Sequence, residues 1–79
     1  MKVNLAVANQ DNTVQVPQCR QAVLIPSSVT SAMLIDNQYI EIVQPACVTF
    51  GPCAEGLSIE PFTVQGPGDN DIITVVWMA

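Results

Sequence analysis

The chain has 79 residues, a formal net charge of −5, no histidine, and two basic residues, Lys2 and Arg20. This scarcity of cations excludes a nucleic-acid-binding protein, which neutralises phosphates with Lys and Arg, and it excludes a polybasic contact with an anionic membrane. Charged residues make up 11% of the chain, whereas soluble domains average about 25%, so neutral side chains must supply most of the polar surface.

The length predicts a single domain, residues 1–79, with a small core. Such a domain buries only about 60% of the surface that its unfolded chain exposes, so its stability is marginal. Small domains gain stability from disulfides, a metal or assembly, and this sequence offers little of the first two. We therefore expect a homo-oligomer, a dimer or a trimer.

No segment approaches the roughly 20 apolar residues of a membrane span, which predicts a soluble protein with no membrane partner. Residues 1–8 imitate a signal peptide, but their apolar part is too short and Asn4 interrupts it. Without such a signal, we expect synthesis in a reducing cytoplasm.

The cysteines, Cys19, Cys47 and Cys53, are odd in number and form no Cys-x-x-Cys motif. This pattern predicts free thiols and neither a disulfide framework nor a zinc site. A bridge between Cys47 and Cys53 stays open as an alternative if the two residues flank one hairpin.

The first half of the chain begins with strand signals. Residues 3–7 alternate between apolar and polar or small side chains, which predicts a strand with one apolar face. Residues 9–12 have turn chemistry, and residues 13–16 resume a β-branched strand that Pro17 ends. The apolar run 22–25, closed by Pro26, is typical of a fully buried strand.

A hairpin follows, with strands over residues 30–35 and 39–43 and an Asx-type connection over residues 36–38. By strand alternation, Ile40 and Ile42 should face the core, while Tyr39 and Glu41 face outward or toward a neighbour. The alternative is a helix over residues 27–35, which has a Ser-rich start but also contains the β-branched Val29 and Thr30.

The second half of the chain predicts further strands, over residues 47–50, 57–60, 62–64 and 72–77. The last of these is apolar on both faces, so we expect both of its faces to meet protein. In total, about eight short antiparallel strands, with turn signals every 8 to 12 residues, predict an all-β fold. It should be a small β-sandwich or a jelly-roll-like barrel.

The sequence predicts no enzyme and no catalytic, cofactor-binding or metal-binding residue. A Ser or Cys nucleophile lacks the usual His base. Glu41, Glu55 and Glu60 are the candidates for a carboxylate pair, yet solvated positions on strands or in loops explain them better. Residues 69–71 offer oxygen ligands for calcium, but Ile73 stands where a further donor is needed, and a plain Asx turn explains the segment.

The four aromatic residues could form a stacking platform for bases or sugars, but in a small sheet protein they are more typical of a core: Tyr39, Phe50, Phe62 and Trp77. Trp77, followed by Met78 near the end of the chain, is the exception, since a large aromatic residue there would anchor a contact with another chain.

Several segments together resemble small all-β accessory proteins of tailed-bacteriophage virions. The resemblance lies in Arg20 before the apolar run 22–25, in the Gly-containing loop that leads to Leu57, Ser58 and Ile59, and in the Gly-rich turn before the terminal strand. It covers roughly residues 13–77 and consists of strands and turns without a diagnostic motif; residues 39–45 and the cysteines have no counterpart.

This resemblance implies a non-enzymatic virion protein, foremost a decoration or cement protein on the capsid surface that contacts the major capsid protein and copies of itself. A tail or fibre component is the alternative within the virion. The residues we expect to make the contacts lie mainly in the terminal strands: Val3, Leu5, Val7, Tyr39, Val75, Trp77 and Met78.

A receptor- or glycan-binding module is the competing hypothesis. It requires Tyr39 or Trp77 at the mouth of a pocket, whereas a cement protein would hold its aromatic residues beneath a subunit contact.

Overall fold

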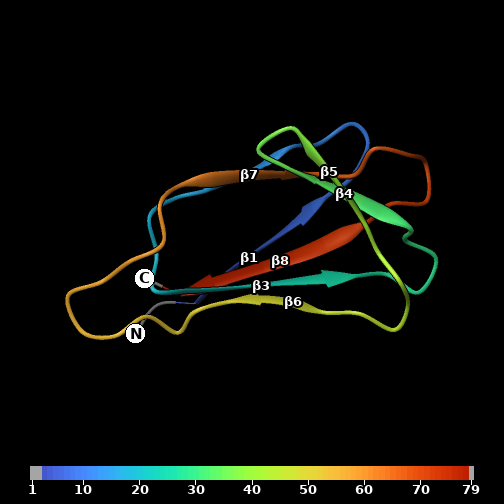
Figure 1. Cartoon of the computed structure of the whole chain (residues 1–79). Helices are drawn as coiled ribbons and strands as arrows, with labels where there is room; N and C mark the ends of the chain where they lie inside the picture. The colour runs from blue at the N-terminus through green and yellow to red at the C-terminus, as the bar shows by residue number, and fades with distance from the viewer. Residues whose placement is uncertain (1–2, 79) are drawn as a thin grey trace.

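The computed structural model describes residues 3–78, which form eight antiparallel strands in two four-stranded sheets (Figure 1). The strands are β1 (Val3–Ala8), β2 (Val14–Val16), β3 (Gln21–Pro26), β4 (Ala32–Ile35), β5 (Gln38–Glu41), β6 (Val48–Phe50), β7 (Phe62–Gln65) and β8 (Ile73–Met78). No helix in this part of the chain is long and apolar enough to cross a membrane.

The sheets have the strand orders β1-β8-β3-β6 and β2-β7-β4-β5. Strand β1 therefore pairs with β8, β2 with β7, β3 with β6 and β4 with β5, so the first half of the chain pairs with the second half in nested order. Each sheet keeps two edge strands. The all-β sandwich is confirmed, and the alternative of a closed barrel is wrong.

The core lies between the sheets and is built by strand alternation. Phe50 of one sheet meets Phe62 of the other edge to face, with ring centroids 5.5 Å apart. Buried aliphatic side chains of β2, β3, β7 and β8 belong to the same core: Val14, Val16, Ala22, Leu24, Val64, Ile73 and Val75.

The predicted hairpin of β4 and β5 is confirmed, with Asp36 and Asn37 in its turn at φ values of 50° and 64°. These positive values are those of the two-residue turn that suits the twist of a hairpin. Ile42 is buried as predicted, but Ile40 is 38% exposed because it lies on an edge strand whose residues are all exposed.

The strand predicted over residues 57–60 is wrong. Ile59 forms only an isolated bridge with Cys19, and Leu57 is exposed. Gly56, at φ +84°, and Pro61 bound this segment, which crosses from one sheet to the other at the end of the sandwich (Figure 1). Its alternation imitated a strand, but no neighbouring strand is available to pair with it throughout.

The helix over residues 27–35 is also wrong, since residues 32–35 are β4. The run 22–25 is a strand, but it is not fully buried. Ile25 is 44% exposed because β3 lies in a sheet with only its inner face covered.

A polar network joins the loops at one end of the sandwich. The buried Asp71 accepts a hydrogen bond of 2.8 Å from the backbone N–H of Ser31. The Gln44 amide donates bonds of 2.8 Å to the backbone carbonyls of Ser27 and Thr30. Asp71 thus turns inward to the protein, as expected of a structural turn.

Candidate functional site

The outer surface of the sheet β1-β8-β3-β6 is largely apolar over β1, β8 and β3, and it carries the polar Thr49 on β6. The registers place Leu5 of β1 beside Val76 of β8, and Val76 beside Val23 of β3. By alternation, the side chains on this surface are Val3, Leu5, Val7, Thr74, Val76, Met78, Gln21, Val23, Ile25 and Thr49. We call this set the outer apolar face.

Four aliphatic side chains of the outer apolar face are exposed. The exposed fractions are 66% for Leu5, 60% for Val3, 44% for Ile25 and 40% for Val7. None of its members is charged, although the chain carries seven acidic residues. A contiguous apolar surface of this kind typically marks a site of interaction with another protein.

Strand β1 also presents a row of backbone groups at the edge of this sheet. In an antiparallel strand, the N–H and C=O of successive residues alternate in direction. The carbonyls of Ile72 and Met78 accept hydrogen bonds from the backbone N–H groups of Ser27 and Arg20, which flank β3. The even-numbered residues of β8 therefore direct their backbone groups toward β3, and residues 73, 75 and 77 direct theirs toward β1.

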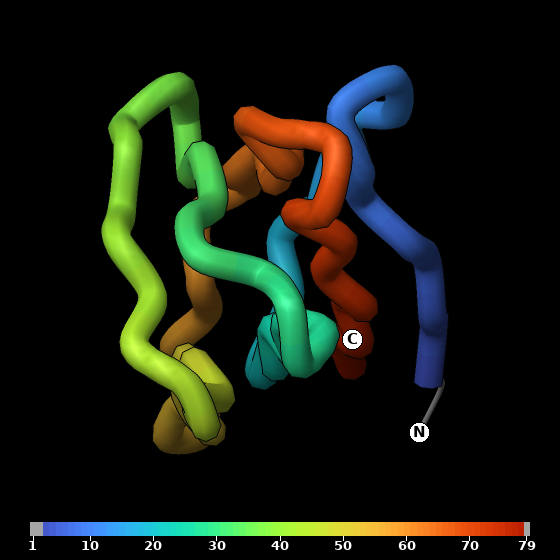
Figure 2. The backbone as a smooth tube through the Cα atoms, turned by 90° about the vertical axis from the view of Figure 1, so that its right-hand side faces the viewer, coloured from blue at the N-terminus to red at the C-terminus, as the bar shows by residue number. Residues whose placement is uncertain are grey.

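Through the register, β8 therefore binds residues 4, 6 and 8 of β1, and the backbone groups of Val3, Leu5 and Val7 point away from the sheet. The Val7 carbonyl agrees with this direction, because it accepts a hydrogen bond of 2.6 Å from the Asn12 side-chain amide. Figure 2 shows β1, in dark blue, along the margin of the molecule.

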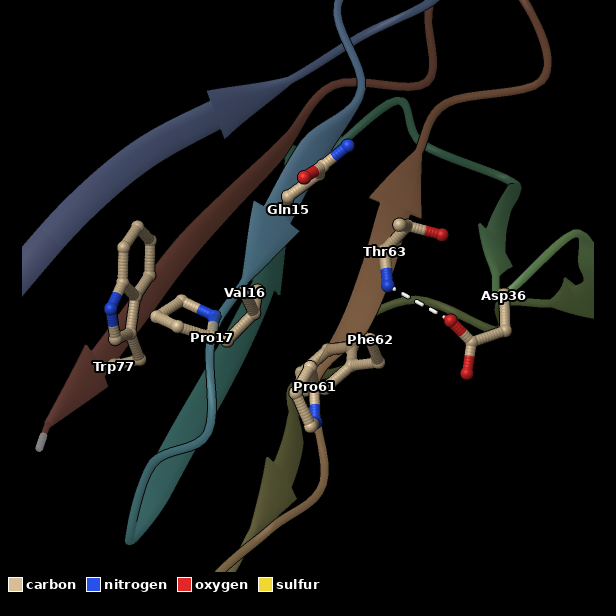
Figure 3. A pocket seen from close by; sticks show the side chains of 8 residues that line it. All are labelled: Gln15, Val16, Pro17, Asp36, Pro61, Phe62, Thr63 and Trp77. Carbon is tan, nitrogen blue, oxygen red and sulfur yellow. Dashed lines mark hydrogen bonds between the residues drawn. The ribbon is translucent and has the colours of Figure 1, made fainter.

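A groove of about 490 Å³ lies beside Trp77 of β8, the one tryptophan of the chain (Figure 3). Its lining is mostly apolar and consists of Gln15, Val16, Pro17, Asp36, Pro61, Phe62, Thr63 and Trp77. Asp36 lies on the side of the groove opposite Trp77, and its carboxylate accepts a hydrogen bond of 3.0 Å from the backbone N–H of Thr63.

The structure separates the predicted contact residues into different places. Val3, Leu5, Val7 and Met78 lie together on the outer apolar face. Val75 is fully buried in the core, so it lies on no surface that could contact another chain.

The two predicted aromatic contact residues lie apart from that face. Trp77 is half-buried, packs against the core and lines the groove. Tyr39 is 67% exposed on β5, in the other sheet.

The prediction missed part of the outer apolar face, namely Val23, Ile25 and Val76. The signal was present in the sequence, since the runs 22–25 and 72–77 are apolar on both faces. The prediction took residues 22–25 as a fully buried strand and so did not assign Val23 and Ile25 to the surface. A strand with one covered face and one exposed apolar face has the same continuous apolar sequence as a fully buried strand.

The candidates for chemistry do not converge within residues 3–78. This part of the chain holds no group of three His, Cys, Asp or Glu side chains that could bind a metal ion. Cys19, Cys47 and Cys53 are free thiols. Burial raises the pKa of the Cys19 thiol above its ordinary 9.0, with a further increase from Cys53, so its neutral form is favoured.

The chain matches no family model, and comparisons with curated proteins and with solved structures found no match.

Proposed function

We propose that the chain is a non-enzymatic structural protein of a virion, most specifically a decoration or cement protein that contacts the major capsid protein on the phage head. The observation that carries this proposal is the outer apolar face. Its exposed aliphatic side chains include Leu5 and Ile25, and the face carries no charge.

The composition of the outer apolar face suits attachment to a large protein surface. Burying apolar area contributes about 25 cal/mol per Å², and neutral side chains such as Gln21, Thr49 and Thr74 lose little on desolvation once they find partners. A Lys or Glu at the same places would have to lose its hydration. The face is therefore suited to close contact with other protein.

The strand order gives further support. Nested pairing of β1 with β8, β2 with β7, β3 with β6 and β4 with β5 is the order of a jelly roll. Viral capsid and lectin domains both use this architecture, and a fold by itself does not assign a function. The order thus fits both a virion component and a glycan-binding module.

The proposal is tested by fractionating particles of the virus that encodes the chain. Heads and tails are separated on a gradient, and the chain is quantified in each fraction. We expect it with intact heads. Recovery with tails would favour the alternative of a tail or fibre component, and absence from both fractions would overturn the virion assignment.

A pair of variants tests the surface itself. Ile25→Glu places a charge on the outer apolar face, and it should lower occupancy on heads at least about tenfold because an unpaired buried carboxylate costs several kcal/mol. Leu57→Glu is the matched control, since Leu57 is 63% exposed in a loop outside that face. Equal occupancy for the two variants would contradict the role of the face.

A second candidate function, glycan binding, is favoured by the groove beside Trp77. An indole ring supplies a flat apolar surface, and the nearby Gln15 and Asp36 supply hydrogen-bonding groups. Because Trp77 is the one tryptophan, its fluorescence reports on the groove directly. Titration with galactose, glucose and N-acetylglucosamine would support this function if the emission shifts saturably, and an unchanged emission would exclude these sugars as ligands.

A further inference from the structure

We propose that β1 pairs with β1 of a second copy in antiparallel orientation, about a two-fold axis that passes through Leu5 perpendicular to the sheet. The proposal rests on the assembly function given above and adds the geometry of self-association. It joins the two sheets β1-β8-β3-β6 into one continuous sheet.

Apart from the Asn12 amide at the Val7 carbonyl, strand β1 lacks the features that usually protect an edge strand. It has six residues, VNLAVA, with no proline and no charged side chain, and its register with β8 is unbroken by a bulge. Natural edge strands are commonly shortened, charged, bulged or covered, because unpaired backbone groups bind other strands. A long, apolar and regular edge is therefore suited to strand pairing.

The direction of the backbone groups decides which register such a pair can have. Val3, Leu5 and Val7 direct their N–H and C=O groups to the open edge, where the Val7 carbonyl already accepts one hydrogen bond from the Asn12 amide and keeps a second lone pair for a partner strand. With the axis at Leu5, Leu5 exchanges two hydrogen bonds with its own equivalent, and Val3 lies opposite the second copy's Val7. This register uses every outward-pointing residue, and a shift of two residues in either direction loses one of these pairs.

The same register keeps the two outer apolar faces on one side. An axis perpendicular to the sheet maps each outer face onto the same side of the joined sheet, so Leu5 packs beside its equivalent. Cross-strand aliphatic pairs of this kind contribute roughly 0.2–1 kcal/mol each. A register offset by one residue would place apolar side chains opposite inward-facing ones, which strand alternation forbids.

A second copy fits this edge because the outward-pointing residues of β1 are self-complementary in this register. With strands about 4.8 Å apart and a rise of about 3.3 Å per residue, the outer apolar face of one copy has a planar footprint of about 330 Å². Joining two copies doubles this footprint to about 670 Å². The pair thus presents a continuous face twice as large as that of a single copy.

Disulfide trapping in the purified chain tests the register. In a Cys47→Ser, Cys53→Ser background, Leu5→Cys puts two thiols opposite each other, because bonded pairs in antiparallel strands have Cα atoms about 5.5 Å apart, within disulfide range. We expect Leu5→Cys to form covalent dimers at least about tenfold faster than Leu57→Cys, a control of similar exposure, owing to the high effective concentration within the pair. Val3→Cys combined with Val7→Cys should also crosslink, whereas Val3→Cys alone should not.

Equal rates for Leu5→Cys and Leu57→Cys, or crosslinking by Val3→Cys alone as fast as by Leu5→Cys, would overturn the proposal. A non-covalent test uses Leu5→Pro, which removes only an N–H at the open edge, where proline is tolerated. Sedimentation at protein concentrations on the order of 100 µM to 1 mM should show dimers for the wild type and monomers for Leu5→Pro, as expected of a small interface. A monomeric wild type would refute the pairing of two β1 strands. It would leave the proposed binding to phage heads intact, because that binding is measured separately.

Discussion

At the scale of single residues, Asp71 joins two of the loops at the end of the sandwich. It is 6% exposed, and its Oδ1 atom accepts from the backbone N–H of Ser31 at 2.8 Å and from the Ser31 hydroxyl at 3.4 Å. Gly66 packs so closely against the Asp71 carbonyl that a Cβ at position 66 would clash with the carbonyl oxygen. The loop before β8 is thus held from two sides.

Replacing Asp71 by alanine should lower the free energy of unfolding by about 1–3 kcal/mol, since the partly buried N–H of Ser31 loses its acceptor. Asp71→Asn should lose less, because it keeps an acceptor oxygen at Oδ1. Urea denaturation measures both, with Asp69→Ala at an exposed position as the control. An unfolding free energy for Asp71→Ala equal to that of Asp69→Ala would contradict this role.

The thiols should differ in reactivity according to their burial. Cys47 is exposed and should react first with a thiol reagent at pH 8, and Cys19, which is 2% exposed with a raised pKa, should react at least about tenfold more slowly. Mass spectrometry after timed alkylation measures the order. Early labelling of Cys19 would show that the core opens more readily than its packing indicates.

The same raised pKa has a consequence for stability. The folded state favours the neutral thiol of Cys19, so this contribution is fully present below the ordinary pKa of 9.0 and is lost as the pH rises through the folded-state value. The free energy of unfolding should therefore fall above about pH 9, and the fall should be smaller in Cys19→Ala. If the free energy of unfolding has the same pH dependence in the wild type and in Cys19→Ala, the Cys19 thiol does not contribute to stability in this way.

At the scale of elements, the strands with local signals could be predicted from the sequence, and the β4-β5 hairpin shows why. Its turn chemistry is contained in Asp36 and Asn37, whose side chains tolerate positive φ. The segment 57–60 shows the limit of such patterns. Alternation states which side chains share a face, but a strand also needs a neighbour, and residues 57–60 pass over the end of the sandwich where pairing is confined to Ile59 and Cys19.

The hairpin turn gives a prediction at this scale. Asn37→Ala keeps a β-carbon at φ 64° but loses the short polar side chain that lets Asn tolerate this conformation, and it should cost about 1 kcal/mol, whereas Asn37→Gly, which has no β-carbon, should be neutral or stabilising. Thermal unfolding followed by circular dichroism compares the two variants directly. A lower melting temperature for Asn37→Gly than for Asn37→Ala would show that the positive φ at position 37 does not limit the stability of the turn.

At the scale of the whole molecule, the nested pairing of the chain's two halves could not be predicted from the sequence. It depends on contacts between distant segments, such as Val3 beside Met78 and Val14 beside Val64, for which local patterns carry no information. The candidate surface was predicted in part, through Val3, Leu5, Val7 and Met78. Its remainder on β3 could not be found until the sheet order placed Val23 and Ile25 beside them.

The central claim is that the outer apolar face is covered by another protein in the assembled particle. The most direct measurement is photo-crosslinking in intact particles, with benzoylphenylalanine placed at Ile25 on that face or at Val43, which is 81% exposed outside it. We predict that the probe at Ile25 crosslinks to the major capsid protein and that the probe at Val43 does so weakly or not at all. Crosslinking from position 43 with none from position 25 would contradict the claim.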